Sequence, residues 1–422
     1  MKPPVVANLA LAVAWLLLFR YCQINSFHDP SSFFYDPTRA YVPFYSAVRE
    51  SESAEFLTKA ASTPATASQP WAYLGKNTGY DDTKSPEGLS VCIGIPSVRR
   101  DREQFVGKTI ASLVDGLSPE ERRRVNLKVL LADDIPQNNP AYGEAWLRNI
   151  ADEVFVYGDD KSSIKDGYQP ITNASLRWVF EDPRNKRVQF DYANLMAACQ
   201  KQGSDYFVLV EDDVIASRDW FKRLTRSIDS VEAQTTKGHD WLYLRLFYTE
   251  TYLGWNSEEW PIYLGKSILV YIAVIGVILS LRWRAPALRQ LKAADLVKAN
   301  MILIINTTIW VAAYIILYFM AGRLLVSPLR GGVHEMPQYG CCAQGLAMPH
   351  RNLAVLEQSL REPPHILAGD SFIDMVADRD GLKKWVMVPS VLQHIGIRGS
   401  SDQGYLKTTW NFSFERGPRK SK

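Results

Sequence analysis

Residues 206–214, with the sequence YFVLVEDDV, join a short apolar run to three consecutive acidic side chains. The run 206–210 is aromatic and aliphatic throughout, which is typical of a strand that is buried on both faces. Three carboxylates directly after a buried strand are costly unless a cation neutralises them. The stretch is therefore either a solvated turn or a site where a divalent ion also binds substrate phosphates.

Apolar runs of similar length occur on both sides of this stretch and alternate with segments of helical spacing such as 188–202. The further predicted strands lie at 89–96, 127–132, 153–157 and 241–247. Strands that alternate with helices predict an α/β domain with a largely parallel sheet. Ligands of such sheets bind beyond the carboxyl ends of the strands, where both the 211–213 run and Asp133-Asp134 are expected.

Three other segments, 5–19, 262–281 and 301–321, are long and almost purely apolar. A bilayer core requires about 20 apolar residues, and only Lys266 interrupts the second segment. The loop between the last two segments is rich in lysine and arginine, which indicates a cytosolic loop and argues against a buried hairpin in a soluble core. We expect the first segment to be an uncleaved anchor rather than a signal peptide, because no small-residue cleavage site follows it.

This topology divides the chain into five predicted parts. They are a cytosolic tip and transmembrane anchor at 1–21, a luminal stem at 22–88, the first half of a catalytic domain at 89–261, a transmembrane hairpin at 262–321 with a cytosolic loop at 282–298, and the second half of the catalytic domain at 322–422. Both catalytic halves, together with glycosylation sequons at Asn173 and Asn411, are then expected in the lumen.

The composition narrows the functional class. Of 422 residues, 47% are hydrophobic and 22% are charged, which fits a globular protein rather than a disordered or fibrous chain. The net charge of +3 lacks the concentrated basicity of a nucleic-acid binder, so we expect no nucleic-acid partner. Five cysteines are too few for a disulfide scaffold. Cys341 and Cys342 could bridge each other, pair with Cys92 or Cys199, or stay free.

Several longer strings resemble one group of glycosyltransferases. VCIGIPSVRR at 91–100, DYANLM at 191–196 and DYFVLVEDD at 205–213 resemble the opening strand, a helix and the acidic strand of the N-acetylglucosaminyltransferase-IV relatives. DSFID at 370–374 and PSVLQHIG at 389–396 resemble their later helix and Q-H-x-G segment. With a membrane hairpin inserted between these two halves, the chain resembles the post-GPI-attachment GalNAc-transferase family.

The resemblance implies a GT-A-like, Rossmann-like fold in the Golgi lumen, within a multi-pass membrane protein. It also implies a UDP-sugar donor (UDP-GalNAc in this family), Mn²⁺ or another divalent cation as cofactor, and inverting transfer. The acceptor would be the mannose core of a GPI glycolipid or of GPI-anchored proteins. The alternatives are N-acetylglucosamine transfer to N-glycans and, in a different class, a metal-dependent luminal hydrolase that uses the acidic run and His394.

Candidate residues for the metal and the donor follow from the acidic run and from the resemblance. Asp213 is expected to bind the metal directly with Glu211, and the Q-H-x-G resemblance adds His394 as a third ligand. The expected nucleotide contacts are Arg99 and Arg100 for the diphosphate, Asp133, Asp134 or Asp191 for uridine or ribose, and Glu211 and Asp212 for ribose or metal-bound water. For each of these residues, the alternative to a functional role is a position in a solvated loop or a purely structural role.

Inverting transfer needs a base that removes the proton of the acceptor hydroxyl. Asp370 and Asp374 are four residues apart, so on a helix they share one face and either could serve. Asp370 is the first choice because it is closer to the preceding Gly369 loop. The alternative is that these charges only complement the dipole at the start of a helix.

Overall fold

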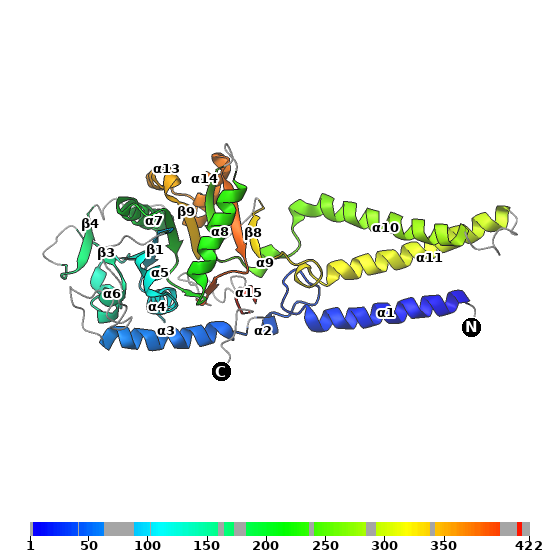
Figure 1. Cartoon of the computed structure of the whole chain (residues 1–422), viewed down its shortest axis with the longest axis horizontal. Coiled ribbons are helices and arrows are strands. Elements are labelled where there is room, and N and C mark those ends of the chain that lie inside the picture. Colours follow the sequence, from blue (N-terminus) through cyan, green and yellow to red (C-terminus); the bar gives the residue numbers. More distant parts are fainter. Residues whose placement is uncertain are drawn as a thin grey trace. The chain divides into compact units, whose positions relative to one another are not determined.

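The computed structural model describes residues 3–40, 42–62, 88–101, 103–158, 164–172, 183–235, 240–283, 293–337, 342–396 and 412–415. The chain divides into two compact units, one of residues 1–42 and 250–329 and the other of residues 43–249 and 330–422. The chain therefore passes from one unit to the other three times, near residues 42, 249 and 329 (Figure 1). The predicted sequons at Asn173 and Asn411 lie outside the described residues.

The first unit consists mainly of long apolar helices. These are α1 (Pro3–Asn25), α10 (Trp260–Trp283) and α11 (Ala293–Met320), accompanied by the short helices α2 (Pro37–Ala40), α9 (Glu250–Leu253) and α12 (Arg323–Val326). Three stretches, 5–25, 251–282 and 297–320, are long and apolar enough to cross a membrane. They coincide with the three apolar segments of the sequence.

The second unit is built on a nine-stranded sheet with the order β4-β3-β2-β1-β5-β9-β7-β10-β8. The strands are β1 (Val91–Ser97), β2 (Val125–Leu131), β3 (Glu153–Tyr157), β4 (Tyr168–Ile171), β5 (Tyr206–Val210), β7 (Trp241–Arg245), β8 (Gly332–Glu335), β9 (Gly345–Pro349) and β10 (Lys383–Val388). All neighbours from β4 to β5 are parallel, whereas β9 runs antiparallel to both β5 and β7. The predicted α/β domain is confirmed, with a sheet that is parallel-rich but mixed.

Helices cover both faces of this sheet, because successive side chains of a strand point to opposite faces. On β1, Cys92 and Gly94 face α7, whereas Ile93 and Ile95 enter the main core with Ile110 of α4. Helices α7 (Pro183–Gln202), α13 (His350–Arg361) and α14 (Gly369–Arg379) pack together on the first face (Figure 1). The remaining helices of the unit are α3 (Tyr45–Ser62), α4 (Val106–Asp115), α5 (Pro119–Arg123), α6 (Ala145–Ile150), α8 (Trp220–Gln234) and α15 (Phe412–Glu415).

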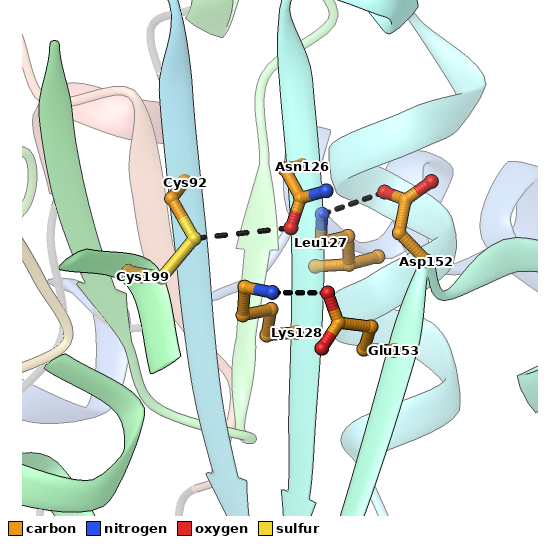
Figure 2. Close-up of a disulfide and its surroundings, with 7 residues drawn as sticks. All are labelled: Cys92, Asn126, Leu127, Lys128, Asp152, Glu153 and Cys199. Carbon is orange, nitrogen blue, oxygen red and sulfur yellow. Dashed lines mark hydrogen bonds and ion pairs between the residues drawn. A yellow bond between two sulfur atoms is a disulfide. The ribbon is translucent and has the colours of Figure 1, made fainter. Parts of the chain in front are cut away.

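A disulfide between Cys92 of β1 and Cys199 of α7 fastens this helix to the sheet (Figure 2). It decides part of the pairing that the sequence left open, because neither Cys341 nor Cys342 can pair with these two residues. Cys342 is disulfide-bonded as well, and Cys341 lies outside the described residues.

Helix α3 differs from the stem that the sequence predicts over 22–88, because it is packed into the second unit against α4 and α6. Its Arg49 is fully buried. The Arg49 guanidinium ion-pairs with Asp115 at 3.0 Å and donates to the carbonyl oxygens of Ala216 at 3.0 Å and Ser112 at 3.2 Å. Residues 45–62 are therefore packed into the second unit rather than forming a linker.

Candidate active site

The acidic run lies at the carboxyl edge of the parallel part of the sheet. Strand β5 ends at Val210, residues 211–213 follow, and the short strand β6 (Val214–Ala216) begins directly after them. Because β1 is the parallel neighbour of β5, its carboxyl end meets the same edge. The Ser97 hydroxyl at the end of β1 donates to Asp212 Oδ2 at 2.8 Å.

Arg100, three residues after β1, supplies a cation to this edge. Its Nη2 donates to Asp212 Oδ1 and lies 3.0 Å from Asp213 Oδ2. Its guanidinium also lies 5.5 Å from the centre of the Phe105 ring. The Arg100 Nε and Nη1 atoms are buried and have no hydrogen-bond partner among the described residues. Two donors are therefore left for an oxygen-rich ligand.

The Q-H-x-G segment reaches the same place from the far end of the chain. Strand β11 (Leu392–His394) pairs antiparallel with β6, with His394 opposite Val214. The His394 Nε2 atom then lies 3.2 Å from Asp213 Oδ2. A Cβ atom at Gly396 would approach Asp213 Oδ2 to 2.4 Å, so only glycine leaves room for this carboxylate.

The three carboxylates differ in their electrostatic environment. Burial alone would raise the pKa of Asp213, but the neighbouring charges and hydrogen bonds of His394 and Arg100 outweigh it and lower this pKa to about 2. Burial raises the pKa of Asp212, although Arg100 opposes the shift. The pKa of Glu211 is raised well above its usual range by burial and then by the charges of Asp213 and Asp370. The pKa of Glu211 and the pKa of Asp213 are thus shifted in opposite directions within one acidic run.

A divalent ion fits part of this arrangement. Asp213 Oδ1 is buried and has no hydrogen-bond partner in the described part of the chain, and the imidazole of His394 lies beside the same carboxylate. One carboxylate and one imidazole are sufficient protein ligands where substrate phosphates complete the coordination. Across the described residues, however, no group of three histidine, cysteine or acidic side chains is arranged to hold a metal by itself.

Asp370 lies in the first turn of α14, where two backbone N–H groups hold its carboxylate. The backbone N–H of Cys342 donates to Asp370 Oδ2 at 3.0 Å, and the N–H of Ser371 donates to Oδ1 at 2.8 Å. The charge of Asp370 also contributes to the raised pKa of Glu211, after burial and the charge of Asp213. Gly369 permits this placement, because a Cβ atom there would lie 2.6 Å from the ring of Tyr192.

Asp374, one turn later, is held in a different environment. It accepts hydrogen bonds from the Tyr243 hydroxyl and from Arg245 Nη2, the latter at 3.1 Å. Arg245 is fully buried, and it also donates to the carbonyl oxygen of Cys342. Arg245 is not among the residues predicted from the sequence, although an arginine at the end of the apolar run 241–245 is a signal for it.

The candidate nucleotide contacts lie around this centre. The backbone N–H of Arg99 donates to Asp133 Oδ2 at 3.1 Å, while the Arg99 side chain is 55% exposed and lies near Asp101. Asp134 lies 3.9 Å from Arg187 of α7. Asp191 is buried and accepts a hydrogen bond of 2.6 Å from the Tyr157 hydroxyl at the end of β3. The structure thus ties Asp133 to the Arg99 backbone and encloses Asp191 within the fold.

Comparison with known proteins identifies relatives that are transferases. The alpha-1,3-mannosyl-glycoprotein 4-beta-N-acetylglucosaminyltransferase B of Mus musculus is 30% identical over 162 residues, which cover 37% of this chain and 28% of that protein. The C enzyme of Sus scrofa is 29% identical over 182 residues, 40% of this chain and 35% of that protein. The A enzyme of Xenopus tropicalis is 26% identical over 162 residues, 37% of this chain and 29% of that protein. The chain thus spans about a third of the length of these relatives.

A family model described as GPI-N-acetylgalactosamine transferase PGAP4 matches residues 91–393. The match extends from the first residue of β1 to Gln393 of β11, so it includes the acidic run, Asp370 and the inserted apolar helices. The family and the relatives all carry the names of enzymes that transfer N-acetylhexosamines. The chain therefore belongs to the PGAP4 family of GPI-N-acetylgalactosamine transferases, which is a family of glycosyltransferases.

Proposed function

We propose that the chain transfers GalNAc from UDP-GalNAc to the mannose core of a GPI glycolipid or GPI-anchored protein. The observation that carries this proposal is the contact of His394 with Asp213 at the carboxyl edge of β5, in a chain of the PGAP4 family whose Asp370 acts electrostatically on Glu211 of the same acidic run. A carboxylate–imidazole pair for a cation beside a separate carboxylate for proton transfer is what metal-dependent sugar transfer requires.

The donor diphosphate would bind at the end of β1. Arg100 offers two unpaired donors there, Nε and Nη1, and a guanidinium suits phosphate oxygens because its donors form a planar fork. Asp213 and His394 would hold Mn²⁺ or another divalent cation, which when bound neutralises charge on the departing UDP. The buried Asp191 and the Asp133–Asp134 turn are proposed to surround uridine and ribose.

Asp370 is proposed as the base, rather than Asp374. The Asp370 carboxylate is oriented by two backbone N–H donors and its charge acts on Glu211 of the acidic run, whereas Asp374 forms an ion pair with the buried Arg245. In the reaction, the acceptor hydroxyl oxygen forms a bond to the anomeric carbon and the bond from that carbon to the UDP oxygen breaks. Asp370 takes the hydroxyl proton, and attack from the opposite side inverts the anomeric centre.

The three long apolar helices support a placement in the Golgi membrane. With the basic loop 282–298 in the cytosol, the chain segments on both sides of the α10–α11 hairpin are luminal. The catalytic unit would then lie in the compartment where UDP-sugars meet glycolipid acceptors.

The test is a panel of UDP-sugars incubated with purified full-length enzyme and Mn²⁺, with UDP release measured with and without a GPI acceptor. We expect UDP-GalNAc to give the largest acceptor-dependent release. A second candidate, N-acetylglucosamine transfer to N-glycans, is favoured by the names of the relatives. Acceptor-dependent release from UDP-GlcNAc with an N-glycan, and none with GPI, would replace the first function by the second.

A further inference from the structure

The first unit contains a cavity of about 670 Å³ that is lined by one face of α10, the facing side of α11 and Leu11 of α1. This volume lies within the range of about 300–1,000 Å³ typical of ligand sites. The α11 wall is aromatic, with Trp310, Tyr314, Tyr318 and Phe319. The α10 wall consists of side chains at helical spacing, among them Tyr263, Ser267, Val270 and Val274.

Hydrogen bonds join α10, α11 and α1 around this cavity. Near the start of α10, Trp255 Nε1 donates to the carbonyl oxygen of Phe319 at 3.0 Å. One side-chain hydrogen bond, between the hydroxyls of Tyr271 and Thr308 at 3.0 Å, joins α10 to α11 farther along. Helix α11 is meanwhile fastened to α1, where the Tyr314 hydroxyl donates to the carbonyl oxygen of Leu11 at 3.0 Å. The contact with α1 therefore helps to hold Tyr314 of the aromatic wall in place.

Among the described residues that line the cavity, Lys266 has the positively charged side chain. It lies six residues after Trp260, or about 9 Å along the helix from its start, and its side chain is exposed to the cavity and its surroundings. No aspartate or glutamate is among the described residues that line the cavity. An ammonium group at this depth of a bilayer is costly unless it meets an anion or extends toward the interface. The long lysine stem allows that extension.

An apolar, aromatic cavity with one cation near its luminal end is complementary to a phospholipid. Aliphatic and aromatic walls suit an acyl or alkyl chain, and a lysine ammonium suits a phosphodiester. The proposed acceptor is itself a glycan linked to phosphatidylinositol, so it carries both chemical groups. This argument rests on the proposed function for the identity of the occupant.

We propose that the cavity between α10 and α11 binds the phosphatidylinositol lipid of the acceptor, with a hydrocarbon chain against the aromatic wall and the phosphodiester beside Lys266. Binding there holds the acceptor on the same molecule that carries the catalytic unit. Such tethering raises the effective concentration of the glycan and needs no further contact with the sugar.

The test uses photoactivatable phosphatidylinositol, with a diazirine in its acyl chain, in phosphatidylcholine nanodiscs that contain the full-length enzyme. Photoactivatable phosphatidylcholine serves as the comparison lipid. We expect the inositol lipid to label peptides of α10 and α11 several-fold more than the choline lipid. Val270→Trp, which fills the cavity, should reduce labelling about tenfold, equivalent to about 1.4 kcal/mol.

The matched control is Ile272→Trp. Ile272 is two residues farther along the same helix, about 200° around it, and is 60% exposed outside the cavity lining. This variant should be labelled like the unmodified enzyme. Lys266→Gln should remove the preference for the inositol lipid without removing labelling. Equal labelling of the two tryptophan variants, or equal labelling by both lipids, would show ordinary bilayer contact and overturn the proposal.

Activity separates this proposal from the proposed function. Transfer to a lipid-free GPI glycan should be the same in Val270→Trp and the unmodified enzyme, whereas transfer to membrane-embedded GPI should fall about tenfold. If Val270→Trp transfers to both acceptors as fast as the unmodified enzyme does, the lipid site is overturned and the proposed function is unaffected. Preferential labelling by the inositol lipid without transfer to any GPI glycan refutes the function and supports a lipid site of that specificity.

Discussion

Replacing Asp370 and Asp374 of α14 in turn by asparagine distinguishes the proposed base from its supporting neighbour. Asp370→Asn removes the group that accepts the proton, and loss of a positioned base lowers turnover by about 10²–10⁴-fold. Its stability cost should be lower than that of breaking a buried ion pair, because the asparagine oxygen can still accept from the N–H of Cys342 or Ser371. One N–H left without an acceptor costs about 1–3 kcal/mol.

Asp374→Asn should have the opposite profile. Arg245 is fully buried and its ion pair with Asp374 is 3.1 Å long. Removing one partner of a buried ion pair costs about 3–5 kcal/mol, because the remaining charge stays buried without compensation. We therefore expect a large drop in the unfolding temperature, with turnover per folded molecule affected less than in Asp370→Asn.

The assay combines thermal unfolding in detergent with single-turnover transfer, normalised to the fraction of enzyme that binds UDP-GalNAc. Normalisation matters because an unstable variant loses apparent activity for reasons unrelated to chemistry. The reasoning is refuted if Asp374→Asn loses turnover at unchanged stability while Asp370→Asn remains active. Asp374 would then be the base.

Three further predictions follow from other contacts. Asp213→Ala and EDTA should each abolish transfer, because the substitution removes a ligand of the cation and EDTA removes the cation itself; full activity in EDTA contradicts this. In metal-free enzyme Glu211→Gln should raise the unfolding temperature at pH 7 but not at pH 4. The raised pKa of folded Glu211 means that the folded state binds the extra proton, so stability falls as pH rises above about 4.5; an effect equal at both pH values argues against it. Replacing both Cys92 and Cys199 by alanine should lower the unfolding free energy by about 2–5 kcal/mol, because their bridge closes a loop of 107 residues; an unchanged unfolding temperature would show that the bridge adds no stability.

The sequence predicts those parts of the fold that depend on local patterns. The apolar run 206–210 indicates β5 because hydrophobic runs of that length occur mainly in buried strands, and the acidic residues after it mark the edge where ligands bind. The contact between His394 and Asp213 joins residues 181 positions apart. No local pattern encodes such a contact, and only the resemblance of the 389–396 segment indicated it.

Helix α3 shows why the remainder could not be predicted. Its sequence, YSAVRESESAEFLTKAAS, is mostly small and polar, so it lacks an apolar stripe and is difficult to distinguish from a linker. Its attachment depends on Arg49, a residue type that is almost never fully buried without a partner. The partners of Arg49, at Ser112, Asp115 and Ala216, are known only when the chain is folded. The ion pair between Arg245 and Asp374 also joins residues far apart in the chain, 129 positions, so it is known only when the chain is folded.

The place of β9 in the sheet has a consequence for the order in which the protein is made. β9 lies between β5 and β7, yet both of those strands precede the α10–α11 hairpin in the chain and β9 follows it. Until the ribosome has delivered residues 345–349, β5 and β7 each retain an unpaired edge, and such edges invite pairing with other chains. Completion of the sheet therefore waits for the hairpin to be synthesised, and the half-built domain depends on protection during that interval.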